Sequence, residues 1–188
     1  MNIIVRPYGS GYCLCRPDTS WERENKDIYP PDYVSGYMWA PVLFARISKA
    51  GKCIGQRFAG RYYDAVGYGI LLYPSDLLDG SPEGCACASC IDHTSVLPFP
   101  MYDRVTLESG TNMFEVYRDG KEIYSTSEGS EAMIEETLTR ISAMVSLRIG
   151  DIAAIELAPV AELAEKPGKT EVAGKFCGNE LFRFNIIF

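Results

Sequence analysis

Three cysteines and the only histidine of the chain fall within one short stretch, as Cys85, Cys87, Cys90 and His93. Thiolate and imidazole groups are the usual ligands of a tetrahedral Zn²⁺ ion. The Cys-x-Cys-x-x-Cys spacing differs from the common pair-of-pairs pattern, although small residues between the cysteines would let the loop bend. The stretch is therefore interpreted either as a Zn²⁺ or thiol site, or as ordinary thiols in a loop.

A nucleophilic or acid–base apparatus would have to use His93, because there is no other histidine. Asp92 is its neighbour in sequence and is poorly placed to orient it, so Asp92 is also read as a turn residue. Glu22 and Glu24 form the only Glu-x-Glu of the chain. Two carboxylates at this spacing could bind a hard cation, but they lie in a charged run that is typical of a solvated surface.

Composition sets limits on the class of protein. With 188 residues of which 47% are apolar, we expect a single domain over residues 1–188. The formal net charge of −7 disfavours nucleic acid and anionic membranes as partners. The chain has no apolar run of about 20 residues and no basic flank at its start. We therefore expect a cytoplasmic protein whose seven cysteines are mostly thiols.

The elements that position these residues are mostly strands. Alternating or apolar runs predict strands at 2–5, 42–47, 62–73, 152–157 and 181–188. An Asp-Gly pair predicts a hairpin over 114–124. Helical spacing predicts one principal helix, which is capped by Ser130 and ends near Val145.

Two segments have no clear periodicity. Residues 80–89 are expected to be a loop. Residues 16–37 combine adjacent prolines, a charge cluster and scattered aromatics, which favours a functional loop or lid and not a compact element. The alternative is a loop that merely packs on the core. Gly67 and Gly69 inside the 62–73 strand indicate that something approaches it closely.

The order of several short motifs resembles the fumarylacetoacetate hydrolase family. The matching segments span most of the chain: Ile4–Tyr8, Leu43–Lys49, Ala65–Tyr68, Ile91–Pro98, Leu147–Ile152, Lys166–Lys169 and Gly178–Leu181. The resemblance implies a mostly β fold of the α+β class, a mixed β-sandwich or β-roll with one principal helix, and a homodimer. It also implies Mg²⁺ or Mn²⁺ as cofactor and a small oxo or diketo acid as substrate.

Most of the catalytic residues that the resemblance implies are missing. The metal-binding Glu-x-Glu belongs at Ala40-Pro41-Val42, and the downstream metal Asp belongs at Tyr73, with Asp76 as the nearest substitute. The general-base His that should follow Tyr8 is absent. The active site of the family is therefore expected to be degenerate.

Five residues are candidates for the substrate pocket that the resemblance implies: Arg6, Tyr8, Tyr68, Asp76 and Glu156. The alternative places Tyr68 in the core and pairs Arg6 with a surface acid.

Three functions stay open. The first is a diverged enzyme acting on small oxo acids, a hydrolase or isomerase with a metal site rebuilt from Asp76 and Glu22 or Glu24. The second is a non-catalytic relative that binds a small molecule or a protein. The third is a Zn²⁺ or thiol protein that uses the stretch from Cys85 to His93.

Overall fold

The computed structural model describes residues 1–108 and 110–188. Most strands belong to a nine-stranded, strongly curved sheet in the order β2-β1-β10-β4-β5-β6-β3, with β11 on β4 and β7 on β5. These strands are β1 (Asn2–Arg6), β2 (Leu14–Pro17), β3 (Trp21–Glu22), β4 (Gly36–Ile47), β5 (Tyr63–Pro74), β6 (Ser95–Val96), β7 (Tyr102–Asp103), β10 (Ile152–Glu156) and β11 (Ala161–Glu165).

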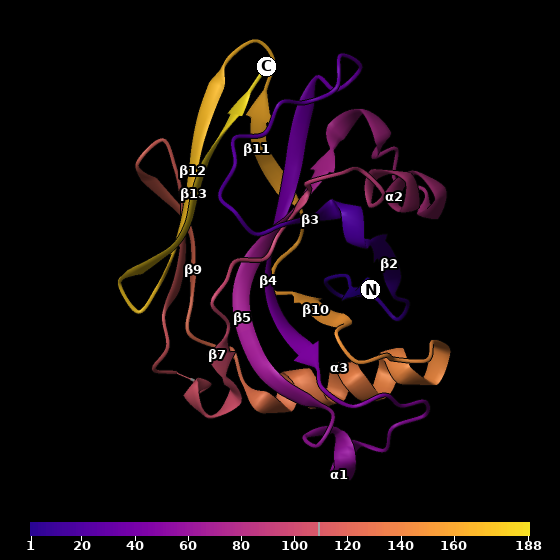
Figure 1. The fold of residues 1–188 in the computed structure, drawn as a ribbon. Coiled ribbons are helices and arrows are strands. Elements are labelled where there is room, and N and C mark those ends of the chain that lie inside the picture. The colour runs from indigo at the N-terminus through magenta and orange to yellow at the C-terminus, as the bar shows by residue number, and fades with distance from the viewer. Residues whose placement is uncertain (109) are drawn as a thin grey trace.

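A second, four-stranded sheet packs against the first at the left of Figure 1. Its order is β13-β12-β8-β9, formed by β8 (Phe114–Arg118), β9 (Lys121–Thr126), β12 (Lys169–Phe176) and β13 (Asn179–Ile187). The helices are α1 (Gln56–Ala59), α2 (Pro82–Ala88) and α3 (Glu131–Met144), with α3 at the lower end of the curved sheet. The expected mixed β-roll with one principal helix is confirmed.

The long pair β4 and β5 is buried on both faces, which explains its almost unbroken apolar sequence. Successive strand residues point to opposite faces. Leu43 accordingly packs in the core between the two sheets, while Val42 and Phe44 pack in a second core inside the curved sheet.

Close approach explains the two glycines of β5. A Cβ on Gly67 would collide with the ring of Phe44, and a Cβ on Gly69 would collide with the backbone carbonyl of Val96. The expected close contact at this strand is confirmed.

One buried side chain joins the two edges of the curved sheet. Arg16 on β2 is fully buried and donates hydrogen bonds to the carbonyl of Leu72 (2.7 Å), the carbonyl of Thr94 (3.0 Å) and the hydroxyl of Ser95 (2.9 Å). Because these acceptors lie on β5, on β6 and directly before β6, Arg16 brings β2 toward the other edge and nearly closes the sheet into a barrel.

The hairpin and the principal helix form as predicted. Asp119 and Gly120 have φ of 50° and 76°, as the tight turn between β8 and β9 requires. The hydroxyl of Ser130 accepts a hydrogen bond from the backbone N–H of Met133 at the start of α3.

The expectation of a loop over 80–89 is wrong, since Pro82–Ala88 forms α2. Ser81 caps this helix by accepting from the backbone N–H of Gly84, and Pro82 takes the first helical position, where its missing N–H costs nothing. The 16–37 segment is also less irregular than expected. It begins at the end of β2, contains β3 and ends in β4, which leaves 23–35 as the long connection.

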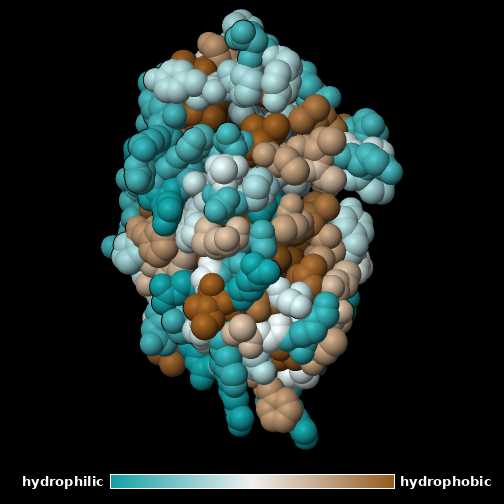
Figure 2. Space-filling view, turned by 45° about the vertical axis from the view of Figure 1, so that its right-hand side comes forward, coloured by the Kyte–Doolittle hydropathy of each residue, from teal (hydrophilic) through white to brown (hydrophobic). Residues whose placement is uncertain are grey.

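On the face that Figure 2 shows, apolar residues lie interspersed with hydrophilic ones. Within residues 1–108 and 110–188, no helix has the length and apolar character needed to cross a membrane.

Candidate functional site

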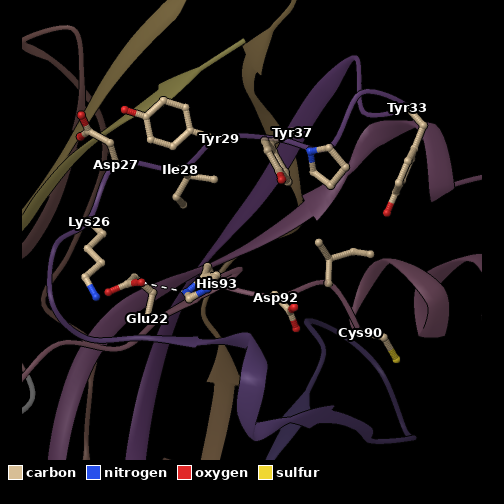
Figure 3. A pocket seen from close by; sticks show the side chains of 12 residues that line it. Glu22, Lys26, Asp27, Ile28, Tyr29, Tyr33, Tyr37, Cys90, Asp92 and His93 are labelled. Atoms are coloured by element: carbon tan, nitrogen blue, oxygen red, sulfur yellow. Dashed lines mark hydrogen bonds and ion pairs between the residues drawn. The ribbon is translucent and has the colours of Figure 1, made fainter.

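A cavity of about 490 Å³ lies between the connection that follows β3 and the loop that follows α2 (Figure 3). One wall is formed by Glu22 and residues 26–37, and the other by residues 90–93. This volume lies in the usual range for small-molecule sites. Part of the 16–37 segment therefore lines a cavity.

The polar centre of the cavity is an interaction between Glu22 and His93. Nδ1 of His93 lies 3.0 Å from Oε2 of Glu22, and the other oxygen of Glu22 accepts the backbone N–H of Glu24 at 2.7 Å. The Glu22 side chain is 5% exposed, whereas that of His93 is 61% exposed. A buried carboxylate thus fixes the imidazole through Nδ1 and leaves Nε2 available to the cavity.

Backbone geometry also holds His93 at this position. Its φ is 59°, a left-handed conformation that is uncommon for a side chain of this size. Its N–H donates to the carbonyl of Thr19 at 3.2 Å. Because β3 and β6 pair in parallel, Glu22 stands opposite Val96 and so close to the preceding loop. Pairing between distant strands, and not sequence adjacency, selects the partner of His93.

Three tyrosines, Tyr29, Tyr33 and Tyr37, also line the cavity. Tyr29 and Tyr33 are exposed, while Tyr37 on β4 is only 2% exposed. Burial raises the pKa of Tyr37 to about 12, so its hydroxyl is a hydrogen-bond donor at neutral pH.

The interior of the curved sheet contains a separate polar network. The guanidinium of Arg16 lies 4.4 Å from the centre of the Tyr73 ring, and the Tyr73 hydroxyl donates to Oε1 of Glu156 at 2.5 Å. The other oxygen of Glu156 accepts the backbone N–H of Tyr8 at 2.9 Å. Burial raises the pKa of Glu156, and its hydrogen bonds from Tyr73 and Tyr8 oppose that rise. Burial likewise raises the pKa of Tyr73.

The three positions at which the resemblance places metal carboxylates come together in this interior. Ala40, Val42 and Tyr73 belong to the same buried apolar cluster. Ala40 and Val42 offer hydrocarbon where Mg²⁺ or Mn²⁺ needs oxygen, and the hydroxyl of Tyr73 is bound to Glu156. The guanidinium of Arg16 already places a positive charge there. These residues do not fit the divalent cation that the fold family implies.

The carboxylates considered for a rebuilt metal site are separated and have other partners. Asp76 accepts the backbone N–H and the hydroxyl of Ser35 at 2.7 and 2.6 Å. Glu24 pairs with Lys26 at 2.6 Å, outside the buried environment of Glu22. Throughout residues 1–108 and 110–188, no three His, Cys, Asp or Glu side chains are grouped to hold a metal ion.

The cysteine stretch is not assembled into a Zn²⁺ site. Cys85 and Cys87 lie on α2, where residues two apart point to nearly opposite faces. The thiol of Cys90 contacts the carbonyl of Ala86 at 3.3 Å, and His93 is held by Glu22. Because residues 82–88 form a helix and not the expected loop, Cys85 and Cys87 diverge.

The five pocket candidates do not line the cavity. Tyr68 is 1% exposed and stacks on Phe114, and Arg6 lies 3.4 Å from Glu136 on α3, as the alternative interpretation held. Only Glu156 and the backbone of Tyr8 meet, in the interior network.

Several residues of these sites had no role in the sequence interpretation. Arg16, Lys26 and Tyr37 give no local signal, because their importance depends on which strands pair. The Glu22–His93 interaction joins residues 71 positions apart.

The similarity of this chain to known proteins is found in its structure and not in its sequence. No protein-family profile matches it, and no curated protein sequence is significantly similar. Fumarylpyruvate hydrolase from Pseudomonas aeruginosa, solved with Mn²⁺ and pyruvate, superposes with a TM-score of 0.79 at 15% identity, covering 100% of this chain and 90% of that one.

Two further structures give the same result. A Yersinia pestis protein described as belonging to the fumarylacetoacetate hydrolase family has a TM-score of 0.79 at 12% identity, covering 99% of this chain and 92% of that one. 2-Hydroxyhepta-2,4-diene-1,7-dioate isomerase from Mycobacterium marinum has a TM-score of 0.79 at 15% identity, covering 99% and 74%. The chain therefore has the fold of the fumarylacetoacetate hydrolase family.

Proposed function

We propose that this chain is a small-molecule-binding protein that uses the fumarylacetoacetate hydrolase fold without a divalent cation. The single observation that carries the proposal is that the positions assigned by the resemblance to metal carboxylates hold two hydrocarbon side chains, Ala40 and Val42, and a phenol bound to Glu156, Tyr73. Ligand binding is assigned instead to the cavity beside Glu22 and His93.

The state of the interior supports the loss of the cation. A hard cation takes about six oxygen ligands, and several carboxylates are needed to offset its dehydration. Glu156 is the buried carboxylate of this network, and it is already engaged by Tyr73 and Tyr8. The buried guanidinium of Arg16 supplies the positive charge that this carboxylate faces.

The cavity supports binding of a ligand. It combines apolar and aromatic walls with a fixed imidazole, which is the usual composition of a small-molecule site. The small oxo acid that the resemblance implies is included in the test as one ligand class among others.

The test is a ligand screen by thermal denaturation, with hits confirmed by isothermal titration in EDTA and in Mn²⁺. Pyruvate and fumarylpyruvate represent oxo acids, beside amines, alcohols and neutral aromatics. We expect at least one class to bind equally well in EDTA and in Mn²⁺. Ile91→Trp, which fills the cavity, should abolish binding, whereas Val105→Trp on the exposed surface should not.

Two results would oppose the proposal. One is tight Mn²⁺ binding on which ligand binding or fumarylpyruvate hydrolysis depends. The other is that Ile91→Trp leaves the affinity of every hit unchanged, since the ligand would then bind outside the cavity.

A second candidate function is metal-free proton transfer, favoured by the contact of 3.0 Å between His93 and Glu22. In this function Nε2 of His93 removes a proton from a carbon next to a carbonyl group, and Glu22 stabilises the resulting imidazolium. Exchange of the methyl protons of pyruvate in deuterated water, followed by NMR in EDTA, tests it. His93→Gln should reduce the rate of protein-catalysed methyl proton exchange by about 10²–10⁴-fold. An unchanged rate rules this function out.

A further inference from the structure

The ionisable groups around the cavity are mostly acidic. The lining residues include three carboxylates, Glu22, Asp27 and Asp92, beside one ammonium group, Lys26, and the imidazole of His93. A ligand carboxylate would therefore meet more negative than positive charge at this site.

Each of the two groups that could neutralise an anionic ligand already has a carboxylate partner, and of their polar atoms Nε2 of His93 stays open to the cavity. Lys26 pairs with Glu24 at 2.6 Å, and His93 pairs with Glu22 at 3.0 Å. Asp27 is also engaged, since one of its oxygens accepts the backbone N–H and the side-chain amide of Asn185, both at 2.8 Å. Asp92 differs from these groups. No hydrogen bond or ion pair joins it to another side chain in the described part of the chain, and it is exposed.

Tyr37 provides an independent indication of a ligand. Its side chain is almost completely buried, and within residues 1–108 and 110–188 its hydroxyl has no hydrogen-bond partner. Figure 3 shows this hydroxyl directed toward the side of the cavity on which His93 and Asp92 lie. The ring is buried while the hydroxyl opens into the cavity, so this donor is free to bond an acceptor on a ligand.

The other tyrosines add aromatic surface to the acidic cavity. Tyr29 and Tyr33 come from the connection before β4 and line the same space (Figure 3). The negative face of an aromatic ring attracts organic cations and does not attract carboxylates.

We infer that the ligand of this cavity is a small organic cation, an amine or ammonium compound that carries a hydrogen-bond acceptor for Tyr37. The ammonium group pairs with Asp92 and lies against tyrosine rings, while the acceptor takes the Tyr37 hydroxyl. This inference rests on the proposed function, and it replaces the oxo acid of the resemblance by a ligand of opposite charge.

Three probes of similar shape separate charge from shape: tyramine, its neutral analogue tyrosol, and its anionic analogue 4-hydroxyphenylacetate. Binding to the full chain is measured by isothermal titration in EDTA at low ionic strength. We expect tyramine to bind at least about tenfold more tightly than 4-hydroxyphenylacetate, with tyrosol between them.

Two variants assign the contacts. Asp92→Asn should weaken the binding of tyramine by about tenfold and leave the binding of tyrosol unchanged. Asp18 is an exposed carboxylate outside the cavity, so Asp18→Asn should change the affinity for neither probe. Tyr37→Phe should lower the affinity for both tyramine and tyrosol by about three- to tenfold, which corresponds to the loss of one hydrogen bond. Thermal denaturation of each variant confirms that it is folded.

Each outcome discriminates. Tighter binding of 4-hydroxyphenylacetate or pyruvate than of tyramine overturns the cation inference and leaves the proposed small-molecule function intact. Equal losses for Asp92→Asn and Asp18→Asn also overturn it, because the effect would then reflect net charge alone. If no probe binds at millimolar concentration, the cation inference fails, and the wider ligand screen decides the proposed function separately.

Discussion

The guanidinium of Arg16 lies 4.4 Å from the centre of the Tyr73 ring, deep inside the curved sheet. Tyr73 occupies the position at which the resemblance expects a metal-binding aspartate. In this chain a phenol therefore stands at the position where the resemblance expects that carboxylate, and a buried guanidinium lies against its ring. The same guanidinium donates hydrogen bonds to β5 and β6, so Arg16 also contributes to closing the sheet.

We predict that Arg16→Met destabilises the fold by about 3–5 kcal/mol. The substitution removes the buried guanidinium that donates hydrogen bonds to Leu72 and Ser95, and it leaves these acceptors without this donor. Urea unfolding measures the change. Arg148→Met, at an exposed residue, serves as control and should stay within about 0.5 kcal/mol of the parent. A loss below about 1 kcal/mol for Arg16→Met would show that the network is not a major source of stability.

The pKa of Glu156 predicts a pH dependence of stability. Burial raises its pKa in the folded state above the ordinary value of 4.5. The folded protein therefore keeps this proton to higher pH than the unfolded chain does. The contribution of Glu156 to the free energy of unfolding is complete below the pKa of the unfolded state and is lost as pH rises through the pKa of the folded state. We expect Glu156→Gln to remove this decline in the free energy of unfolding above about pH 4.5.

Urea unfolding across the acidic to neutral range measures this difference. Glu83→Gln, at an exposed residue, provides the control and should leave the pH profile unchanged. Parallel profiles for the parent and Glu156→Gln would mean that the carboxyl titrates alike in the folded and unfolded states.

The fold could be predicted largely because its signals are local. The Asp119-Gly120 turn, the Ser130 cap and the apolar periodicity of α3 each depend on nearby residues. The sequence does not predict the short helix α2, although Ser81 and Pro82 carry an ordinary helix-start signal, because the small residues and cysteines that follow have no apolar periodicity.

The candidate site was less accessible from sequence because tertiary pairing creates it. His93 was recognised as the only possible histidine catalyst, but its partner Glu22 comes from a strand 71 residues earlier. Asp92, adjacent in sequence, is not the partner. Tyr37 lies within β4, where its role depends entirely on the cavity beside it.

Close packing in β5 gives a third prediction. Gly69→Ala should cost about 1–3 kcal/mol, since the added methyl group would collide with the carbonyl of Val96 in the neighbouring strand. Gly11→Ala is the matched control, because a Cβ at Gly11 meets nothing within 4 Å. Thermal denaturation compares the two variants, and equal stabilities would mean that β6 moves away from β5 without cost.

The last prediction concerns the position at which the resemblance places a metal carboxylate. Val42 is 0% exposed and packs in the interior cluster. Val42→Glu buries a second carboxyl group opposite Glu156, its partner on β10, so we expect a loss of about 3–5 kcal/mol, whereas Val105→Glu at an exposed position should be nearly neutral.

Added Mn²⁺ makes this substitution a test of the interior as a whole. If the other groups of a cation site persisted there, the carboxylate introduced by Val42→Glu would let Mn²⁺ bind the folded state and raise its melting temperature. We expect no such rise, because Ala40 offers no oxygen, the oxygens of Glu156 are already engaged by Tyr73 and Tyr8, and Arg16 places a fixed positive charge beside Tyr73. Mn²⁺-dependent stabilisation of Val42→Glu, but not of Val105→Glu, would show that the chain retains part of a metal site and that only the carboxylate was lost.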